Sequence, residues 1–318
     1  MAGTEAAGSR SLRPPRNPSP PEPHETVMSG WSTTLYELLV RASTDLPEDV
    51  ERVLCQARAD EVSANARAAL DTMLRNAELA RARRLPICQD TGTLLFWVTV
   101  PPRTLTQTDF NAAAATAIAA ATAAGVLRQN CVETLSGRNT GNNLGPGSPV
   151  IHWHEAAQDN VEVALILKGG GCENVGIQYS LPDVGLGAER SLEGVRRCAL
   201  DAVVRAQGQG CAPGVLGIAV GGDRATGYAE SKELLLRRLG ERSPVPELAD
   251  LEQRLLREAN TLEIGPMGFG GRTTLLDVFV GCRSRVPASY FVSISYMCWA
   301  YRRRRVLARP DGEAIRWS

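Results

Sequence analysis

The stretch Leu85-Pro86-Ile87-Cys88-Gln89-Asp90-Thr91-Gly92 places a thiol, an amide, a carboxylate and a hydroxyl directly before a glycine. Because glycine has no side chain, it lets the backbone turn tightly beside whatever those groups hold. The run from Leu94 to Val100 follows, is rich in β-branched and aromatic residues and stops at Pro101, which predicts a buried strand. We therefore expect the chain to be organised around a functional turn that leads into a buried strand.

Helical and extended patterns alternate on both sides of this turn. Before it, apolar residues recur at helical spacing from Trp31 to about Arg84, with a break at Asp45-Leu46-Pro47. After the strand, Asp109 is expected to cap a long alanine-rich helix that ends near Gly125. Further helices are expected at 192–207, 229–239 and 246–259, and further strands at 149–154, its hairpin-like partner 161–167, 215–222, 274–280 and 290–297. This alternation predicts an α/β fold with mixed sheets surrounded by helices.

The composition limits the classes of protein to which the chain can belong. At 318 residues with 43% hydrophobic content, the chain can bury a sizeable core. Its 35 basic and 35 acidic residues cancel, so no global field points to nucleic acid or an anionic membrane as partner. No apolar run reaches the roughly 18 residues that a membrane span needs. Eight dispersed cysteines, without a Cys-x-x-Cys pair or a signal peptide, indicate a cytoplasmic protein rather than a disulfide scaffold.

The two ends of the chain carry biased composition. Residues 1–30 are rich in proline, serine and charged residues, which predicts a disordered tail, and residues 31–318 are expected to form one domain. Four consecutive arginines, Arg302 to Arg305, lie close to the other end. A run this short in a neutral protein is typical of a solvated helix end, so we assign it no chemistry.

Three glycine-rich turns adjoin apolar strands, at Gly169 to Gly171, Gly221 to Gly222 and Gly268 to Gly271. Backbone N–H groups on such turns can converge on an anion, although tight packing explains the same glycines. None of the turns fits the dinucleotide pattern or ends as a phosphate-binding loop does, in Gly-Lys-Ser/Thr. A carboxylate therefore remains a possible ligand of these turns.

Metal-ligating side chains occur at several places. Cys88, Cys211 and Cys298 each lie at the edge of a predicted element, where three thiolates could hold an iron–sulfur cluster that leaves one iron open. Cys172 lies inside a glycine-rich turn and could face the same cavity. His152 and His154 share one face of a strand, and we interpret them as the polar face of an edge strand rather than as metal ligands. The remaining cysteines are interpreted as packing residues, and they are Cys55, Cys131, Cys198 and Cys282.

Five ordered motifs carry a resemblance to a known family. They are PICQDTG at 86–92, KGGGCEN at 168–174, CAPGVLGIAVGG at 211–222, IGPMGFGG at 264–271 and YMCWAYRRR at 296–304. From about residue 31 onward, the chain resembles the α subunit of class I, iron–sulfur-dependent fumarate hydratase and of its sibling, L-tartrate dehydratase. Two positions depart from the usual family pattern, since Cys172 stands in place of serine and Ala212 in place of proline.

The resemblance implies a cofactor and a set of roles. A [4Fe–4S] cluster would be bound by Cys88, Cys211 and Cys298, with the fourth iron free for substrate. Asp90 would be the base that takes a proton from carbon. The residues that would contact the dicarboxylate are Gln89, Asp90, Arg128 and Gly171. If Cys172 bound the open iron, it would close the substrate position.

The resemblance also implies an activity and a partner. The activity would be the hydro-lyase reaction that interconverts fumarate and (S)-malate, a step of the tricarboxylic acid cycle, with dehydration of L-tartrate to oxaloacetate as the alternative. A separate β subunit would contribute the catalytic acid, in an α2β2 heterotetramer. Two other classes stay open from the residues alone: a cluster-free binding or regulatory protein, and a nucleic-acid binder that acts through Arg302 to Arg305.

Overall fold

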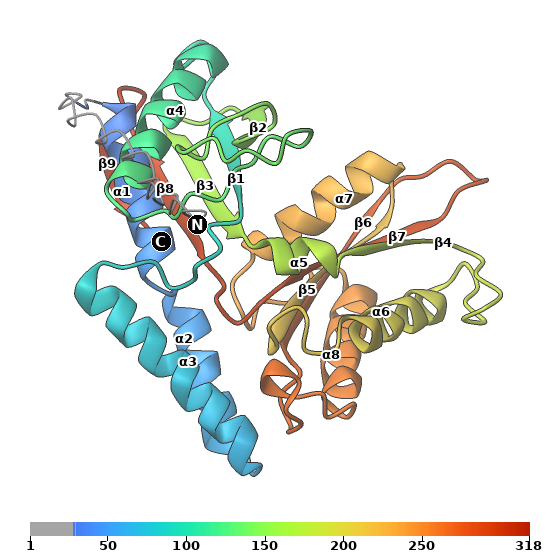
Figure 1. Ribbon diagram of the computed structural model, residues 1–318. Helices are drawn as coiled ribbons and strands as arrows, with labels where there is room; N and C mark the ends of the chain where they lie inside the picture. Colours follow the sequence, from blue (N-terminus) through green and yellow to red (C-terminus); the bar gives the residue numbers. More distant parts are fainter. Residues whose placement is uncertain (1–27, 29) are drawn as a thin grey trace, which may run out of the picture.

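The computed structural model describes residue 28 and residues 30–318, so the predicted disordered tail lies almost entirely outside the described residues. The first sheet has five strands in the order β2-β1-β3-β8-β9, and the second has four in the order β4-β7-β5-β6. Both sheets mix parallel and antiparallel neighbours. The predicted α/β class with mixed sheets is therefore confirmed. Figure 1 shows the two sheets as two lobes, with the short helix α5 between them.

The first lobe is built from two distant parts of the chain. Its elements are α1 (Trp31–Thr44), α2 (Glu48–Asp60), α3 (Ala64–Arg83), β1 (Thr93–Val100), α4 (Gln107–Ala123), β2 (Val150–Glu155), β3 (Val161–Lys168), β8 (Arg303–Ala308) and β9 (Ala314–Trp317). The predicted helical region 31–84 and the strand after the glycine turn are both confirmed.

The second lobe comes from one continuous segment. Its elements are α5 (Gly170–Asn174), β4 (Ile177–Ser180), α6 (Leu192–Ala206), β5 (Gly214–Gly221), α7 (Arg224–Glu233), the 3-10 turn η1 (Leu234–Leu236), α8 (Pro246–Asn260), the 3-10 turn η2 (Pro266–Gly268), β6 (Leu275–Arg283) and β7 (Phe291–Met297). The helix expected at 229–239 begins earlier, at Arg224, and ends in η1.

The side chains of successive residues of β1 point alternately into two hydrophobic cores. Leu94, Phe96 and Val98 face α1 and α4, whereas Leu95 and Trp97 face the core shared with α2, α3 and the second lobe. Successive side chains of a strand point to opposite faces, so a strand buried on both faces joins two cores. A third core lies between the second sheet and helices α6 and α8. None of the helices in the described part combines the length and apolar composition that a membrane crossing requires.

Three local predictions are wrong. Strands β2 and β3 do not form a hairpin, because β1 lies between them and pairs with both. Helix α4 is capped by Thr106, whose hydroxyl accepts a hydrogen bond from the backbone N–H of Asp109 at 3.1 Å, so Asp109 lies inside the first turn. The arginine run is not a solvated helix end. It enters β8, which pairs with β3.

Arg302 and Arg303 are buried and Arg304 and Arg305 are half-buried, and the last three of these arginines pair with distant acidic residues. Arg303 pairs with Asp49 of α2, and Arg304 Nη2 lies 3.0 Å from Asp45 Oδ2. Arg305 Nη1 lies 2.7 Å from Glu162 Oε1 on β3. A guanidinium that is held by a carboxylate can occupy a strand position that local charge density alone would assign to solvent.

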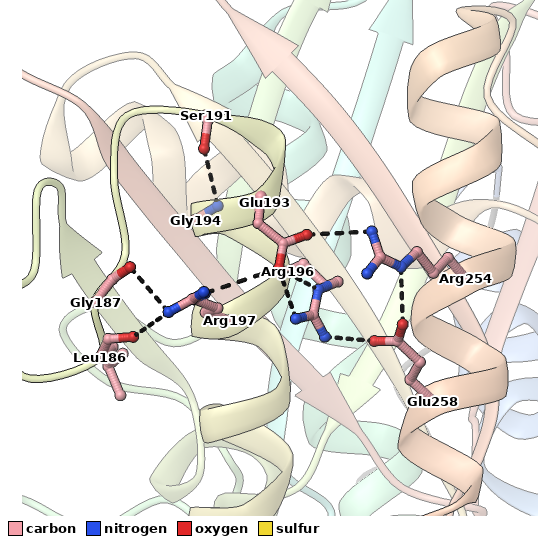
Figure 2. A network of polar contacts seen from close by, with 9 residues as sticks. All are labelled: Leu186, Gly187, Ser191, Glu193, Gly194, Arg196, Arg197, Arg254 and Glu258. Carbon is pink, nitrogen blue, oxygen red and sulfur yellow. Dashed lines mark hydrogen bonds and ion pairs between the residues drawn. The ribbon is translucent and has the colours of Figure 1, made fainter.

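Two carboxylates of the helices in the second lobe accept hydrogen bonds from arginines, one of them in the interior and the other near the surface. Glu252 of α8 is fully buried and accepts hydrogen bonds from Arg237 Nη1 at 2.6 Å and from the backbone N–H groups of Ser243 and Val280. The side chain of Glu193 on α6 is 44% exposed, and Figure 2 shows it pairing with Arg196 and with neighbouring arginines of α6 and α8. The Arg196 hydrogen bond lowers the pKa of Glu193 to about 2.

We expect Glu252→Ala to lower the free energy of unfolding by about 3 to 5 kcal/mol, because it leaves two backbone N–H groups and Arg237 without their acceptor. Chemical denaturation followed by circular dichroism measures this change. The matched control is Glu193→Ala, whose carboxylate is screened by solvent and which should cost far less. Equal losses in the two variants would contradict the role assigned to Glu252.

Candidate active site

The predicted turn at 85–92 is fixed by contacts with three other segments. The backbone N–H of Ile87 donates to Ser43 O at 2.9 Å, and Ile87 O accepts from Asn76 Nδ2 at 2.8 Å. The hydroxyl of Thr91, a buried residue, donates to Arg128 O at 2.7 Å. The turn is therefore tied to α1, to α3 and to the segment that follows α4.

Gly92 brings this turn against the end of β3. Its φ angle is +78°, in the region that favours glycine, and a Cβ built on it would lie only 2.4 Å from the carbonyl carbon of Lys168. This close approach places Asp90 beside the glycines that follow Lys168. The carboxylate oxygen Oδ2 of Asp90 accepts from the backbone N–H of Gly170 at 2.6 Å, and Oδ1 accepts from Asn130 Nδ2 at 2.5 Å.

The cysteines proposed as ligands belong to one electrostatic neighbourhood, although they lie far apart in sequence. Burial raises the pKa of Cys211, and the nearby charges of Cys172, Cys88 and Asp90 raise it further. The backbone joins two of the segments directly, because Trp299 N–H donates to Cys211 O at 3.3 Å. Cys211 itself has a φ of +55°, a conformation that is uncommon for a residue with a side chain.

Cys172 lies beside Cys298 in this neighbourhood, and both are buried. The hydrogen bond with Cys298 lowers the pKa of Cys172 to about 7, with Lys168 and Arg302 acting in the same direction. The same hydrogen bond, followed by burial, raises the pKa of Cys298 well above its ordinary value. The two thiols therefore compete for negative charge, because a thiolate on one of them disfavours a thiolate on the other.

The thiol groups do not form a site for a single metal ion. Within the described residues, no group of three or more His, Cys, Asp or Glu side chains could hold one. Ligands of one ion must share a point about 2.3 Å from each sulfur, whereas the thiolates of an iron–sulfur cluster bind different irons. His152 and His154 lie on an edge strand, β2, as interpreted from the sequence, and the ring of His152 stacks on that of Trp97 with centroids 4.9 Å apart.

The predicted substrate contacts lie on the open side of this neighbourhood. Gln89, Arg128 and Gly171 are exposed, and Asp90 is half-buried. The carbonyl of Arg128 is fixed by Thr91 and by Asn143 Nδ2, so its backbone is held while its guanidinium group stays on the surface. A cavity of about 960 Å³ lies elsewhere, between α1, α2, η1 and β8, and none of these predicted contacts lines it.

Sequence reasoning missed several residues of the site. Asn130, which donates to Asp90, and Arg302, which lies beside the thiols, were given no role. Glu173 binds both lysines of the chain: its carboxylate oxygens lie 3.3 Å from Lys168 Nζ and 2.8 Å from Lys232 Nζ. The position of Arg302 only four residues after Cys298 was a signal that could have indicated its location.

The interpretation of the other cysteines as packing residues holds for some of them and not for others. Cys198 is fully buried in the core of the second lobe. Cys131 is half-buried, whereas Cys55 and Cys282 are exposed, so for these two the interpretation is wrong. Cys55 lies on α2 and Cys282 lies near the end of β6. Each is at a position that the period of its helix or strand turns toward solvent.

Comparison with known proteins identifies the class. The family model for fumarate hydratase (Fumerase) matches residues 32–307. The chain therefore belongs to the class I fumarate hydratase and L-tartrate dehydratase α-subunit family, whose members are iron–sulfur hydro-lyases.

Individual relatives divide between the two activities. The chain is 48% identical over 290 residues to "Putative fumarate hydratase class I" of Geobacillus stearothermophilus, an alignment that covers 89% of this chain and 56% of that protein. It is 33% identical over 283 residues to "Putative L(+)-tartrate dehydratase subunit alpha" of Methanocaldococcus jannaschii, covering 86% and 95% of the two chains. It is 32% identical over 271 residues to the L(+)-tartrate dehydratase subunit alpha of Escherichia coli K12, covering 85% and 88%.

We expect Gly92→Ala to disrupt the site, because the new methyl group would clash with the Lys168 backbone in addition to the strain of a positive φ. The free energy of unfolding should fall by about 2 to 5 kcal/mol, as measured by chemical denaturation.

Gly125→Ala is the matched control, since Gly125 has a similar φ of +71° but no atom within 4 Å of the added Cβ. Its free energy of unfolding should fall only by the cost of the strained φ. If Gly125→Ala is as harmful as Gly92→Ala, the close approach to Lys168 is not what matters.

Proposed function

We propose that this chain is the α subunit of an iron–sulfur hydro-lyase that interconverts fumarate and (S)-malate. The observation that carries the proposal is that Cys211 lies within electrostatic reach of Cys88, of Cys298 and of the carboxylate of Asp90, which is itself held by two hydrogen bonds. The higher identity to the relative named as a fumarate hydratase favours fumarate over tartrate. L-tartrate dehydration is the alternative.

The residues fit a [4Fe–4S] cluster. Three thiols from separate segments are brought together, and two buried cations, Lys168 and Arg302, lie within electrostatic reach of Cys172 next to them. Cys88, Cys211 and Cys298 would hold the cluster, which would supply a Lewis-acidic iron with an open position for substrate oxygen. Cys172 would stay a free thiol hydrogen-bonded to Cys298, because its binding to the open iron would exclude substrate.

Asp90 has the position of a base for a carbon acid. The hydrogen bonds from Asn130 Nδ2 and Gly170 N–H fix the orientation of its carboxylate, so that it presents the same edge to each substrate molecule. In the dehydration direction, it takes the proton from the carbon next to the one that carries the hydroxyl, and the electron pair of the C–H bond forms the new double bond as the C–O bond breaks. The hydroxyl leaves as water, with its second proton from the catalytic acid that we assign to the β subunit. In the hydration direction, it returns that proton.

Arg128 and Gln89 are suited to binding the dicarboxylate. The guanidinium group of Arg128 forms no hydrogen bond or ion pair with the described residues, and the same is true of the Gln89 amide, so both are available to a ligand. A planar guanidinium group can bind a carboxylate with two parallel hydrogen bonds. The backbone N–H of Gly171, an exposed residue, would stabilise negative charge as it builds on the substrate.

A β subunit is proposed to complete this site, in an α2β2 heterotetramer. The exposure of Gln89, Arg128 and Gly171 supports this, because a carbon acid is deprotonated poorly in open solvent. Two of the relatives are named α subunits, and the third is considerably longer than its matched portion. The β subunit would supply the catalytic acid. All eight cysteines are free, which suits a reducing compartment such as the cytoplasm.

The test is anaerobic reconstitution of the full chain with iron and sulfide, followed by assays on fumarate and L-tartrate with and without the β subunit. We expect a brown protein with about four iron atoms per chain and little activity without the β subunit. Asp90→Asn should keep the iron and lower kcat by about 10² to 10⁴, the usual contribution of a general base. Cys298→Ser should fail to hold the cluster.

Other outcomes discriminate between the alternatives. A colourless chain that binds no iron would indicate a cluster-free binding or regulatory protein. A preference for tartrate in the reconstituted complex would assign the sibling activity. Binding of nucleic acid through Arg302 to Arg305 is disfavoured already, because Arg302 and Arg303 are buried and the next two arginines pair with acidic residues.

A further inference from the structure

Arg302 is a buried cation without a protein partner. Only 1% of its surface is exposed, and none of its three guanidinium nitrogens, Nε, Nη1 and Nη2, forms a hydrogen bond with the described residues. A guanidinium group carries five N–H donors and remains charged at any physiological pH. Burial of such a group without an anion is strongly unfavourable, so the position requires an anion that the protein itself does not supply.

The backbone of Arg302 is held in place by two hydrogen bonds. Its backbone N–H donates to Ala300 O at 2.9 Å, and its carbonyl accepts from the backbone N–H of Leu167 at 3.0 Å. The next residue, Arg303, is also buried but pairs with Asp49 and lies over the ring of Tyr301 at 4.9 Å. Two adjacent arginines of similar burial thus differ in one respect: Arg303 has a carboxylate partner and Arg302 does not.

The guanidinium group of Arg302 lies within electrostatic reach of two of the thiols. Its charge acts on both Cys172 and Cys298. The group also reaches the glycine turn, because a Cβ built on Gly169 would lie 3.8 Å from Arg302 Nη2 and 3.0 Å from Asp90 Oδ2. The nearby Lys168 Nζ also lacks a hydrogen-bond partner among the described residues, but it lies 3.3 Å from a carboxylate oxygen of Glu173. Arg302 therefore differs from Lys168 in having no carboxylate of the described residues within ion-pair distance.

We propose that Arg302 is the resident counter-cation of the iron–sulfur cluster, a positioning residue whose N–H groups donate to the sulfur atoms around Cys298. This inference rests on the proposed function. A [4Fe–4S] core with three thiolates is a net anion, and hydrogen bonds to its sulfurs and its net charge are the factors that set its reduction potential. Since Arg302 is almost completely buried, a resident anion satisfies it better than a substrate that enters and leaves with water.

The role predicts opposite effects of Arg302→Met on the chain with and without iron. Without the cluster, the variant should melt at the same temperature as the wild-type chain or above it, because an unpaired buried cation has been removed. With the cluster, it should gain less than half of the increase in melting temperature that reconstitution gives the wild type. Iron release to an added chelator should be at least about tenfold faster, as a loss of charge-assisted hydrogen bonds requires.

A second readout is the reduction potential of the cluster, measured by a redox titration followed by electron paramagnetic resonance. Removal of a positive charge disfavours the reduced form, so the potential of Arg302→Met should become more negative. A tenfold change in the one-electron equilibrium corresponds to about 59 mV. Arg302→Lys keeps the charge but loses the planar fork, and its values should lie between those of the wild type and Arg302→Met.

Arg303→Met is the matched control. It breaks a buried ion pair with Asp49, so it should lower the melting temperature of the iron-free and the reconstituted chain by equal amounts. An Arg302→Met chain that behaves in this way, or that fails to fold without iron, would overturn the proposal. So would a variant that changes only the KM for the dicarboxylate. Absence of iron from the wild-type chain would instead refute the proposed function.

Discussion

The close approach of the Gly92 turn to the end of β3 is the contact on which the arrangement of the site depends. It lets one short loop, held by α1 and α3 of the first lobe, meet the glycines through which the chain passes into the second lobe. Cys88 and Asp90 come from the loop, and Gly170 and Cys172 come from the glycines that it meets. The segments that carry Cys211 and Cys298 are then added by the second sheet, since β5 begins and β7 ends beside them. The site is a junction rather than a pocket within one lobe.

Local patterns predicted the elements well, and the pairing between elements less well. The strand after Gly92 follows from its composition, and so do the helices before it, because these signals need only neighbouring residues. The alternation of apolar and polar residues can identify a strand, but it does not identify the strand that pairs with it. The short connection between β2 and β3 suggested a hairpin, yet β1 lies between them, and only the long-range register records this.

Charge was the feature that the sequence predicted least reliably. Arg303 and Arg304 look like part of a solvated run because their partners, Asp49 and Asp45, lie more than 250 positions away along the chain. The two lysines of the chain show the same limit, because nothing in the sequence pairs both of them with Glu173. In contrast, the proposed ligands Cys88, Cys211 and Cys298 were named from ordered motifs, and the structure brings them near one another. Their assignment as cluster ligands remains a prediction.

The two halves of the first lobe also meet at its edge. Trp31 Nε1 donates to Pro310 O at 2.9 Å, and Thr34 Oγ1 donates to Gly312 O at 2.5 Å, so α1 contacts the turn between β8 and β9. The second lobe is inserted between these parts as one continuous segment. During synthesis on a ribosome, the four-stranded sheet can therefore close while the five-stranded sheet still lacks β8. The edge of β3 stays unpaired until the last strands emerge, and the thiols of the site are assembled late, when Cys298 and Arg302 arrive just ahead of that strand.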